Sequence, residues 1–431
     1  MGVAAREGSV GGKMDIAEQA TVTAPPVRVD GYARRALGAS MLGYAMDGFD
    51  LLILGFMLKA ISAELGLSAA EAGSLVTWTL GGAVAGGVLF GCLSDHMGRI
   101  RVLTWTILIF ALFTGLCALA TGYRDLLVYR TIAGLGLGGE FGIGMALAAE
   151  TWPPQLRARA SSYVGLGWQA GVLLAALATP VLLPAIGWRG MFAVGLVPAL
   201  VSFLVRRAVG EPEIAVRARR GGNEAGRGAG WLASLRLLVK DRATAKISFA
   251  MLVLCSVQNF GYFGLMIWLP SYLSTRFGYG LTQSALWTGV TILGMAAGIL
   301  AFGELADRIG RRPAFLTYQA GAVVMVLVYS QLTDPTALLL GGAVMGLFVN
   351  GMLGGYGTLM SELYPTAARA TAQNVLFNLG RAVGGFGPVV VGSLAAAYSF
   401  SAAIALLATI YLLDMVVTAL LIPERRGAVL D

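Results

Sequence analysis

The chain has 431 residues, of which 57% are hydrophobic and only 13% are charged. Soluble proteins are about 25% charged, so this composition excludes a soluble globular protein and predicts a polytopic membrane protein. The net charge of +8 does not indicate nucleic-acid binding, because the basic residues lie between long apolar runs.

The N-terminal segment 1–31 is polar and includes Arg6, Lys13 and Arg28. It lacks the short apolar core and the small-residue cleavage site of a signal peptide. We therefore expect this segment to form a disordered cytoplasmic tail.

Twelve apolar runs follow, each near the roughly 20 residues that a helix needs to cross a bilayer. They lie near 36–61, 72–94, 102–122, 126–150, 161–184, 188–208, 246–271, 285–306, 314–332, 335–361, 370–398 and 401–422. The charged, glycine-rich stretch 211–230 separates two sets of six and is typical of a linker. We expect an all-α membrane protein whose twelve transmembrane helices form two six-helix bundles related by pseudo-two-fold symmetry. The predicted boundaries are 32–208 for the N-terminal bundle, 209–243 for a cytoplasmic linker, 244–424 for the C-terminal bundle and 425–431 for a cytoplasmic tail.

The basic residues predict the orientation of these helices, because cytoplasmic loops are enriched in Lys and Arg. With the N-terminus inside, 25 of the 31 Lys and Arg residues fall on the cytoplasmic side. The exceptions are Lys59, Arg124, Arg189 and Arg276 outside, and Arg130 and Arg381 within spans. We therefore expect a multi-pass protein of the plasma (inner) membrane with both termini in the cytoplasm.

Two sequence matches at one offset indicate that the bundles are repeats. "GCLSDHMGRIR" (91–101) matches "GELADRIGRRP" (303–313), and "AETWPPQLRARA" (149–160) matches "SELYPTAARATA" (361–372), each 212 positions apart. Parallel repeats are typical of alternating-access transporters, whose substrate site lies between the repeats.

The loop signature G-x-x-x-D-x-x-G-R-x-R resembles that of the major facilitator superfamily, and the resemblance covers essentially all of residues 32–426. Its two copies stand at Gly91, Asp95, Gly98, Arg99 and Arg101, and at Gly303, Asp307, Gly310, Arg311 and Arg312. Within that superfamily, D-G-x-D in the first span, with Arg369 and Arg381, is similar to the aromatic acid:proton symporters. The first and fourth spans are also similar to those of sialate and monocarboxylate symporters. The resemblance implies the twelve-helix fold and transport of a small organic acid with protons.

Two carboxylates lie within the first span, "SMLGYAMDGFDLLILGFMLKAI" (40–61). A carboxylate at the bilayer centre costs about 2.5–3.5 kcal/mol, so intramembrane acids are functional candidates by default. Asp47 and Asp50 are i and i+3 on one helix face, and such close acids do not both ionise cheaply. They are therefore candidate proton carriers. The alternative is structural pairing with a basic residue of a neighbouring helix.

Glu140, in "AGLGLGGEFGIGMALAAE" of the fourth span, is a third candidate for proton coupling or substrate contact. Gly134, Gly136 and Gly139 before it spell G-x-G-x-x-G, but no strand precedes them, so a dinucleotide site is not predicted. They favour close helix packing instead. A buried structural pair is the alternative for Glu140.

Arg381, near the middle of the eleventh span, is the first candidate for binding a substrate anion. A guanidinium keeps its charge and can fork onto a carboxylate, although a permanent ion pair is the alternative. The 212-residue offset pairs Arg381 with Gln169, Asp47 with Asn259, and Asp50 with Tyr262. We expect proton handling in the first bundle and neutral hydrogen bonding with Arg381 in the second. The other candidates for contact with the substrate are Tyr262 and Tyr356, which could stack on a ring, and Arg130, which could also assist proton transfer or an outer gate.

Charged residues of the four matching cytoplasmic segments are expected to form gating contacts that hold one conformation and break in the other. The predicted short-range pairs are Asp95 with Arg99 and Asp307 with Arg311. The predicted extensions are Glu150 with Arg157 or Arg159, and Glu362 with Arg369.

The leading hypothesis is a proton-coupled symporter that imports a small organic anion by alternating access, with an aromatic carboxylate such as a hydroxybenzoate as the foremost substrate. The expected partners are the substrate, protons and the lipid bilayer, and a monomer suffices. No nucleic acid, metal or cofactor is implied, and the single histidine and lack of a Ser-His-Asp set argue against an enzyme. The alternatives are a sialate or aliphatic monocarboxylate symporter, sodium coupling, and a membrane receptor without transport.

Overall fold

The computed structural model describes residues 29–196, 233–278 and 281–428, together with a few isolated positions between 200 and 216 and residue 430. Most of the predicted tail 1–31 and most of the predicted linker 209–243 lie outside these residues. All elements of the described part are helices, which confirms the all-α prediction there.

The described helices follow one another along the chain with short connections. The first half contains α1 (Gly31–Leu65), α2 (Ala69–Met97), α3 (Arg99–Cys117), α4 (Tyr123–Thr151), the 3-10 helix η1 (Pro154–Leu156) and α5 (Arg157–Val194). The second half contains α9 (Ala233–Leu237), α10 (Arg242–Phe277), α11 (Leu281–Ile309), α12 (Arg311–Gln331), α13 (Pro335–Gly351), α14 (Leu353–Leu363), α15 (Arg369–Gly384), α16 (Gly387–Ala397) and α17 (Phe400–Leu421).

Within the described residues, 11 helical stretches are long and apolar enough to cross a membrane. The longest, Pro154–Val194, is interrupted at Gly187, whose φ of 66° suits glycine and turns the chain. This stretch therefore joins the fifth predicted span to the beginning of the sixth, and most of the remainder of the sixth lies outside the described residues.

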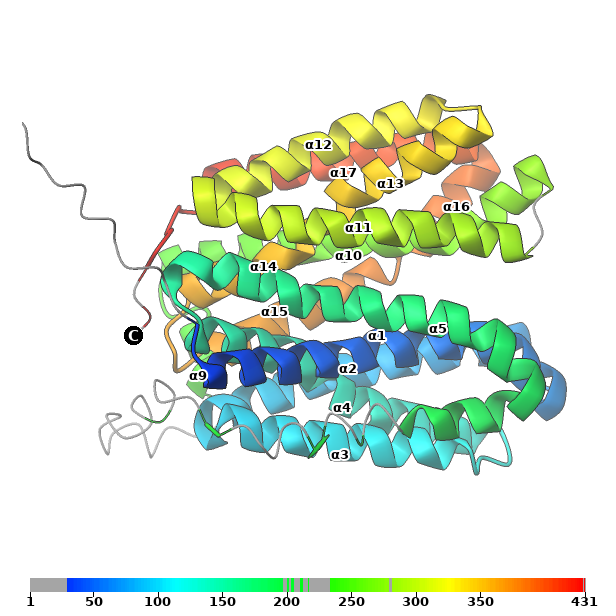
Figure 1. The fold of residues 1–431 in the computed structure, drawn as a ribbon, viewed down its shortest axis with the longest axis horizontal. Helices are drawn as coiled ribbons and strands as arrows, with labels where there is room; N and C mark the ends of the chain where they lie inside the picture. The colour runs from blue at the N-terminus through cyan, green and yellow to red at the C-terminus, as the bar shows by residue number, and fades with distance from the viewer. Residues whose placement is uncertain are drawn as a thin grey trace, which may run out of the picture.

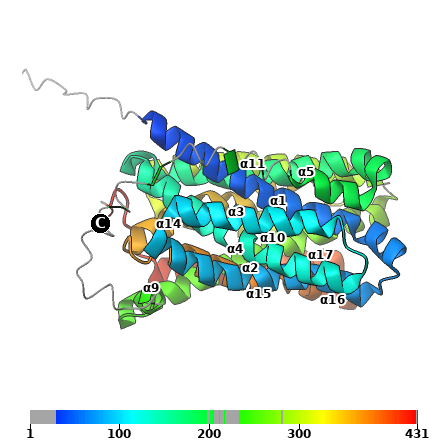
Figure 2. The ribbon, with the colours of Figure 1, turned by 90° about the horizontal axis from the view of Figure 1, so that it is seen from below.

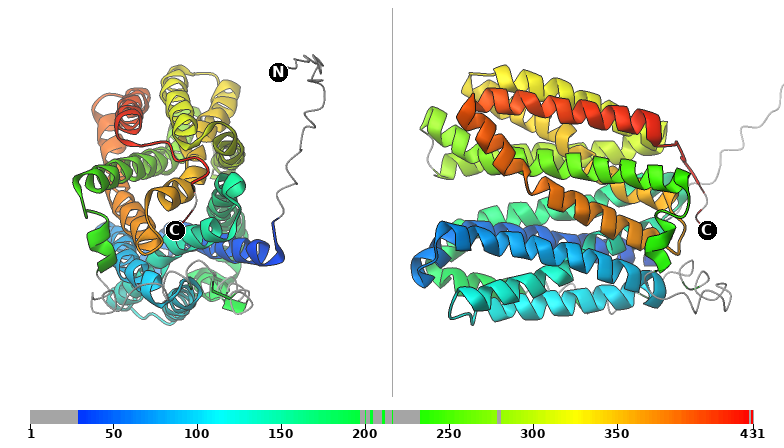
Figure 3. Two further views of the ribbon diagram at one scale, coloured as in Figure 1. Left: turned by 90° about the vertical axis from the view of Figure 1, so that its left-hand side faces the viewer. Right: turned by 180° about the vertical axis from the view of Figure 1, so that it is seen from behind.

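The two halves of the chain form two layers that lie against each other along their length (Figures 1 and 3). Helix α5 contacts α11 and α14, while α2 and α4 contact α15. The start of α1, the short helix α9 and the C-terminus lie at the same end of the bundle (Figures 1 and 2). The interface between the layers thus runs from this end toward the opposite one.

The loop signature forms the same tight turn in each half. Gly98 separates α2 from α3 with a φ of 116°, and Gly310 separates α11 from α12 with a φ of 106°. Only glycine adopts such positive angles without strain. We call the end of the bundle that carries these turns, with segments 91–101 and 303–313, the signature end.

Two spans of the second half are interrupted. The tenth predicted span is divided into α13 and α14 at Met352, and the eleventh into α15 and α16 at Gly385 and Phe386. Arg381 lies in the last turn of α15, next to its break. The backbone stays in the right-handed helical region at both places, with φ and ψ of −59° and −21° at Met352 and of −59° and −20° at Gly385, so each span bends without unwinding.

Candidate functional site

A small cavity lies between the two halves. It is lined by Tyr44 and Trp168 of the first half, and by Gln258, Asn259, Tyr262, Phe263, Asn350, Leu353, Phe377 and Arg381 of the second. Its volume of about 20 Å³ has room for about one water molecule. A molecule larger than water therefore fits only after the surrounding helices have moved apart.

Of the arginines that the structure describes, only Arg381 lines this cavity, and it is 3% exposed. Its guanidinium carbon lies 5.4 Å from the ring centroid of Trp168 and 5.3 Å from that of Phe377. Among the described residues, no carboxylate forms an ion pair with it. The predicted candidates Asn259 and Tyr262 line the same cavity.

Aromatic rings enclose the cavity and connect the two halves. The indole nitrogen of Trp168 donates a hydrogen bond to the hydroxyl of Tyr262 over 3.1 Å. The ring of Tyr44 lies 5.3 Å from that of Trp168. On another side, Phe141 of the first half stacks on Phe377 of the second with 3.7 Å between ring centroids. Flat apolar surface therefore surrounds the arginine.

The two acids of the first span have different surroundings. Asp47 is buried one turn after Tyr44 on α1, and the hydroxyl of Tyr44 interacts electrostatically with both Asp47 and Arg381. Asp50 instead accepts two hydrogen bonds from Arg130 of α4, at 2.9 Å to Oδ1 and 2.7 Å to Oδ2. Asp47, Asp50 and Arg130 do not line the cavity, and the structure brings Asp50 and Arg130 together as a buried ion pair.

Glu140 of α4 points its side chain toward α3, where its Oε1 accepts a hydrogen bond of 2.8 Å from Thr106. It is 5% exposed and does not line the cavity. The neighbouring glycines allow the close packing that we expected, since a Cβ on Gly136 would lie 2.5 Å from the carbonyl oxygen of Thr106.

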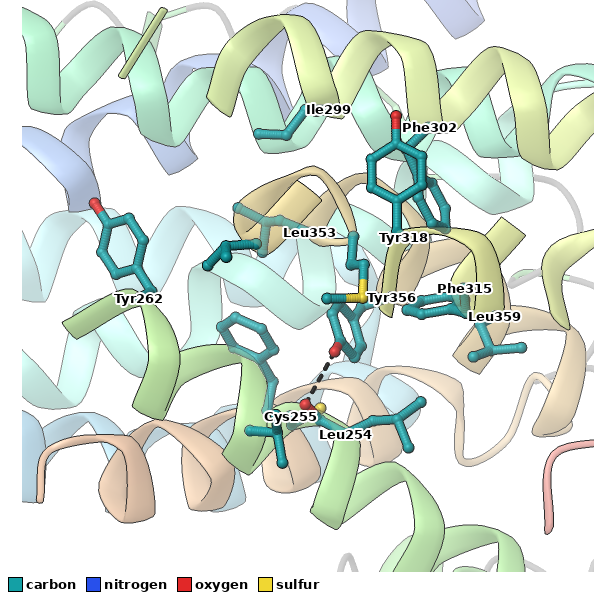
Figure 4. Packing of buried hydrophobic residues seen from close by; sticks show 14 of the residues in the cluster. Leu254, Cys255, Tyr262, Ile299, Phe302, Phe315, Tyr318, Leu353, Tyr356 and Leu359 are labelled. Atoms are coloured by element: carbon teal, nitrogen blue, oxygen red, sulfur yellow. Dashed lines mark hydrogen bonds between the residues drawn. The ribbon is translucent and has the colours of Figure 1, made fainter. Parts of the chain in front are cut away.

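Two further candidates are buried but do not line the cavity. The Tyr356 hydroxyl donates to the Leu254 carbonyl over 2.9 Å, and the close-up in Figure 4 shows it within the packed interior of the second half. Gln169 is 2% exposed, and its side-chain amide makes no hydrogen bond in the part of the chain that the structure describes. It follows directly after Trp168, which does line the cavity.

A buried charge network of the first half reaches into the second half at the signature end. Arg99 contacts Asp95 at 2.5 Å and Glu150 at 2.9 Å, and Glu150 also contacts Arg369 of the second half at 2.8 Å. Asp95 accepts a hydrogen bond of 2.9 Å from the backbone N–H of Thr371. The start of α15 is thus fixed to the first half.

The second half forms the matching network. Arg311 contacts Asp307 at 3.2 Å and Glu362 at 2.8 Å. Asp307 accepts hydrogen bonds from the backbone N–H groups of Ala158 and Arg159, at 3.1 and 3.2 Å. Both predicted short-range pairs of Asp with Arg are therefore present, and each also binds the start of a helix from the other half.

The structure corrects the partners predicted for the two glutamates. Glu150 pairs with Arg369 rather than with Arg157 or Arg159, and Glu362 lies 3.8 Å from Arg157 rather than beside Arg369. The reason is that equivalent segments of the two repeats face each other across the interface, so each glutamate meets the arginine of the other repeat. Arg159 approaches Asp307 at 3.8 Å.

Two asparagines of α15 bind the first half between the charge network and the cavity. Asn374 Oδ1 accepts a hydrogen bond of 2.8 Å from the backbone N–H of Gly142, and Asn378 Nδ2 donates one of 2.9 Å to the carbonyl of Gly138. Together with the Phe141–Phe377 stack, they join the two halves along α15 between the cavity and the charge network.

Sequence reasoning missed two glutamates that stabilise the signature turns. Glu211 accepts from the backbone N–H groups of Arg99 and Arg101 at 2.8 and 3.1 Å. Glu424 accepts from those of Arg311 and Arg312 at 3.2 and 2.8 Å. The two glutamates are 213 positions apart, one more than the repeat offset of 212. An alignment of the two repeats that allowed a one-residue shift would therefore have paired them as equivalent residues. The cavity residues Tyr44, Trp168 and Asn350 were missed as well, because polar and aromatic residues in a span are common in packing.

Comparison with known sequences gives one family and several close relatives. The sequence profile of the family described as the Major Facilitator Superfamily matches residues 40–298 and 277–429. A protein of Haemophilus influenzae that is only inferred to transport a metabolite is 66% identical over 404 residues, which cover 94% of this chain and 99% of that protein. The cis,cis-muconate transport protein of Acinetobacter baylyi is 30% identical over 392 residues, 90% and 94% of the two chains. The sialic acid transporter NanX of Escherichia coli is 30% identical over 372 residues, 85% and 88% of the two chains.

A solved structure of the proton:xylose symporter XylE, bound to 6-bromo-6-deoxy-D-glucose, has the same fold. It superimposes with a TM-score of 0.78 at 19% identity, covering 94% of this chain and 98% of that one. This similarity concerns the fold alone, and it agrees with the all-α, two-bundle architecture predicted from the sequence.

Proposed function

The chain belongs to the major facilitator superfamily, and from this premise we propose that it is a proton-coupled symporter of a small organic acid anion. Its relatives are named as transporters rather than enzymes. The observation that carries the proposal is Arg381, a buried guanidinium that lines the central cavity without a described carboxylate partner. An incoming carboxylate supplies the missing countercharge.

Transport follows from charge compensation in this site. A buried charge without a partner costs several kcal/mol, so the bundles close around the site readily only when that charge is compensated. The carboxylate of the substrate compensates Arg381, and a proton compensates an acid of the first span. Because each requirement must be met before the bundles move, substrate and proton cross together.

We assign the proton site to Asp47. It is buried and does not itself line the cavity, but it lies one turn after the cavity residue Tyr44, whose hydroxyl is close enough to both Asp47 and Arg381 for their charges to act on it. Asp50 has the permanent countercharge of Arg130. Glu140 accepts a hydrogen bond from Thr106 away from the cavity. Asp50 and Glu140 are therefore secondary candidates.

The proposed cycle uses the signature end as the cytoplasmic gate. The two bundles, proposed as 32–208 and 244–424, rock about the cavity, and the networks of Glu150 with Arg369 and of Asp307 with the start of α5 break when the cytoplasmic side opens. Both termini and the signature turns then face the cytoplasm of the cell whose plasma (inner) membrane holds the protein. A monomer contains the whole pathway.

The substrate class follows from the cavity walls. Arg381 lies against the faces of Trp168 and Phe377, so a flat unsaturated acid can stack in the same space. An aromatic carboxylate such as a hydroxybenzoate can pair its carboxylate with Arg381 and stack its ring on the aromatic side chains. One relative is named for cis,cis-muconate, a flat acid, and another for sialic acid, which remains the competing substrate class.

Transport into proteoliposomes tests the function. We expect accumulation of labelled 4-hydroxybenzoate or benzoate above equilibrium when an inward proton gradient is imposed, and loss of accumulation with a protonophore. Parallel assays use cis,cis-muconate, sialic acid and lactate, with protein-free liposomes as the control. Accumulation driven only by a sodium gradient would contradict proton coupling, and absence of counterflow with every acid would contradict transport of organic acids.

The Asp47→Asn variant tests the coupling. We expect it to abolish proton-driven accumulation while it leaves substrate exchange intact, because the amide mimics a permanently neutral acid. The matched control is Asp414→Asn, which changes another buried carboxylate, one that lies on α17 and accepts a hydrogen bond from Gln319. The control should retain accumulation. Full uphill transport by Asp47→Asn would remove this residue from the proton site.

A further inference from the structure

Two side-chain amides form a joined pair in the wall of the cavity. Gln258 of α10 donates from Nε2 to Oδ1 of Asn350, which lies in the last turn of α13, over 2.7 Å. Both side chains are 2% exposed, and both line the cavity together with Arg381. A molecule that fills this small space therefore contacts the amide pair and the guanidinium at once.

The amide pair leaves one acceptor and one donor without a partner. Gln258 Oε1 and Asn350 Nδ2 make no hydrogen bond within the described part of the chain. Turning both amides over exchanges their oxygens and nitrogens, but the bond between them survives and one donor and one acceptor still remain. The hydrogen-bonding character of the pair is therefore independent of how the two amides are oriented.

This combination selects the chemistry of a ligand. Buried polar groups without a partner are costly and rare, so a ligand that satisfies them binds more tightly than one that does not. The complementary group accepts from one amide and donates to the other. A hydroxyl does both with a single oxygen, whereas a carboxylate or an ether only accepts and an ammonium only donates.

We propose that Gln258 and Asn350 select organic acids that carry a hydroxyl group, whose oxygen bridges the two amides while Arg381 binds the carboxylate. The inference rests on the proposed function, because it assigns a specificity to the same cavity. In this arrangement α15 binds the carboxylate through Arg381, whereas α10 and α13 bind the hydroxyl through Gln258 and Asn350.

Ligand binding to the purified protein tests the proposal without any variant. Isothermal titration calorimetry compares benzoate with the three hydroxybenzoates and with the corresponding methoxybenzoates, and compares propionate with lactate. We expect at least one hydroxybenzoate to bind about tenfold to a hundredfold more tightly than benzoate, because two hydrogen bonds to buried groups are gained. Its methyl ether, which accepts but does not donate, should bind no more tightly than benzoate.

The double variant Gln258→Met, Asn350→Leu tests the residues. We expect its affinity for the preferred hydroxybenzoate to fall to about that for benzoate, while its affinity for benzoate stays within about threefold of wild type. Leu359→Met, a change of similar volume at a buried residue of the second half that does not line the cavity, is the matched control and should preserve the ratio of the two affinities.

The outcomes separate this inference from the proposed function. Equal affinities for benzoate and all hydroxybenzoates, or a methyl ether that binds as tightly as the hydroxyl compound, would overturn the selection of hydroxyl groups and leave acid transport standing. An undiminished preference in the double variant would exclude the amide pair as its source. Failure of every acid to bind, lactate and propionate included, would overturn the proposed function and this inference together.

Discussion

Arg381 is a buried cation whose described neighbours compensate its charge only in part. The faces of Trp168 and Phe377 each contribute about 0.5–2 kcal/mol of cation–π attraction. These interactions orient the guanidinium, but they supply no full negative charge, and a substrate carboxylate does.

This partial compensation predicts opposite effects on ligand binding and on stability. Arg381→Gln should weaken binding of an aromatic acid by more than about tenfold, because a charge-assisted forked hydrogen bond is lost. The same change should leave the melting temperature of the ligand-free protein unchanged or raise it, since a costly buried charge is removed. Calorimetric titration and thermal unfolding measure the two quantities. Arg381→Lys should also bind weakly, and unchanged affinity in either variant would exclude Arg381 from the site.

For Arg130, another buried arginine, we predict that substitution lowers the stability of the protein. It forms a forked ion pair with Asp50, and removing one partner of a buried pair leaves the other charge uncompensated. Arg130→Met should therefore destabilise the protein by about 3–5 kcal/mol, and so should Asp50→Leu. The double variant should recover most of this loss, as measured by thermal or denaturant unfolding in detergent. Additive losses in the double variant would show that each residue acts independently of the other.

At the scale of helices, the fit of α15 against α2 and α4 depends on glycine. A Cβ at Gly142 of α4 would lie 2.5 Å from the backbone nitrogen of Asn374, and one at Gly87 of α2 would lie 2.5 Å from the side chain of Asn378. The backbone contact leaves no flexible atom that could move aside. An added methyl group at either glycine would therefore oppose this close approach of α15 to α2 and α4.

Gly142→Ala should shift the protein toward the form that is open at the signature end. Overpacking costs about 1–3 kcal/mol in the closed form, which raises the open population by about fivefold or more. Cys92 is a native reporter, because it is buried at the contact between α2 and α15. In a background with Cys117→Ala and Cys255→Ala, its rate of alkylation by a maleimide should rise.

Gly144→Ala is the matched control on the same helix. A Cβ there meets its nearest atom, in Ser40, at 3.4 Å, which is an ordinary contact. Alkylation of Cys92 should therefore stay near the wild-type rate. An equal rise in both variants would mean that alanine loosens α4 in general and would contradict the role of Gly142 in closure.

At the scale of the whole molecule, the described ion pairs between the halves lie at the signature end. Glu150 with Arg369 and Arg159 with Asp307 join the halves there. At the opposite end, Glu64 pairs with Arg189 of the same half, and this neighbour lowers the pKa of Glu64 below its usual value. In this structure the halves are thus joined by ion pairs at the signature end, and the cavity between them has room for about one water molecule.

The sequence predicted the parts of this architecture that depend on composition and local pattern. Apolar run length indicated the spans, and the repeated motif located the turns at Gly98 and Gly310. The irregular turn at Met352, which separates α13 from α14, was not predicted, because nothing in its apolar sequence surroundings distinguishes it from the rest of the span. The partners of Glu150 and Glu362 were predicted wrongly, since contacts between the repeats depend on how the bundles face each other. Arg381 could be identified because a charged residue within a span is rare. Asn350 could not, because neutral polar residues are common within spans.

The two repeats are not equivalent in how strongly they join the halves, and this asymmetry gives a final prediction. Arg369 contacts Glu150 at 2.8 Å, whereas its counterpart Arg157 lies 3.8 Å from Glu362 and donates instead to the backbone carbonyl of Ala428. The Glu150–Arg369 contact should therefore contribute more to closure than the Glu362–Arg157 contact.

Double-mutant cycles on the Cys92 alkylation rate measure both contacts, because one opening movement of the bundles exposes the reporter in either case. The variants are Glu150→Gln with Arg369→Gln, and Glu362→Gln with Arg157→Gln. We expect a coupling energy of about 1–3 kcal/mol for the first pair and less than about 0.5 kcal/mol for the second. Equal coupling energies would contradict the asymmetry, and would mean that the closed form uses both repeats alike despite their different distances.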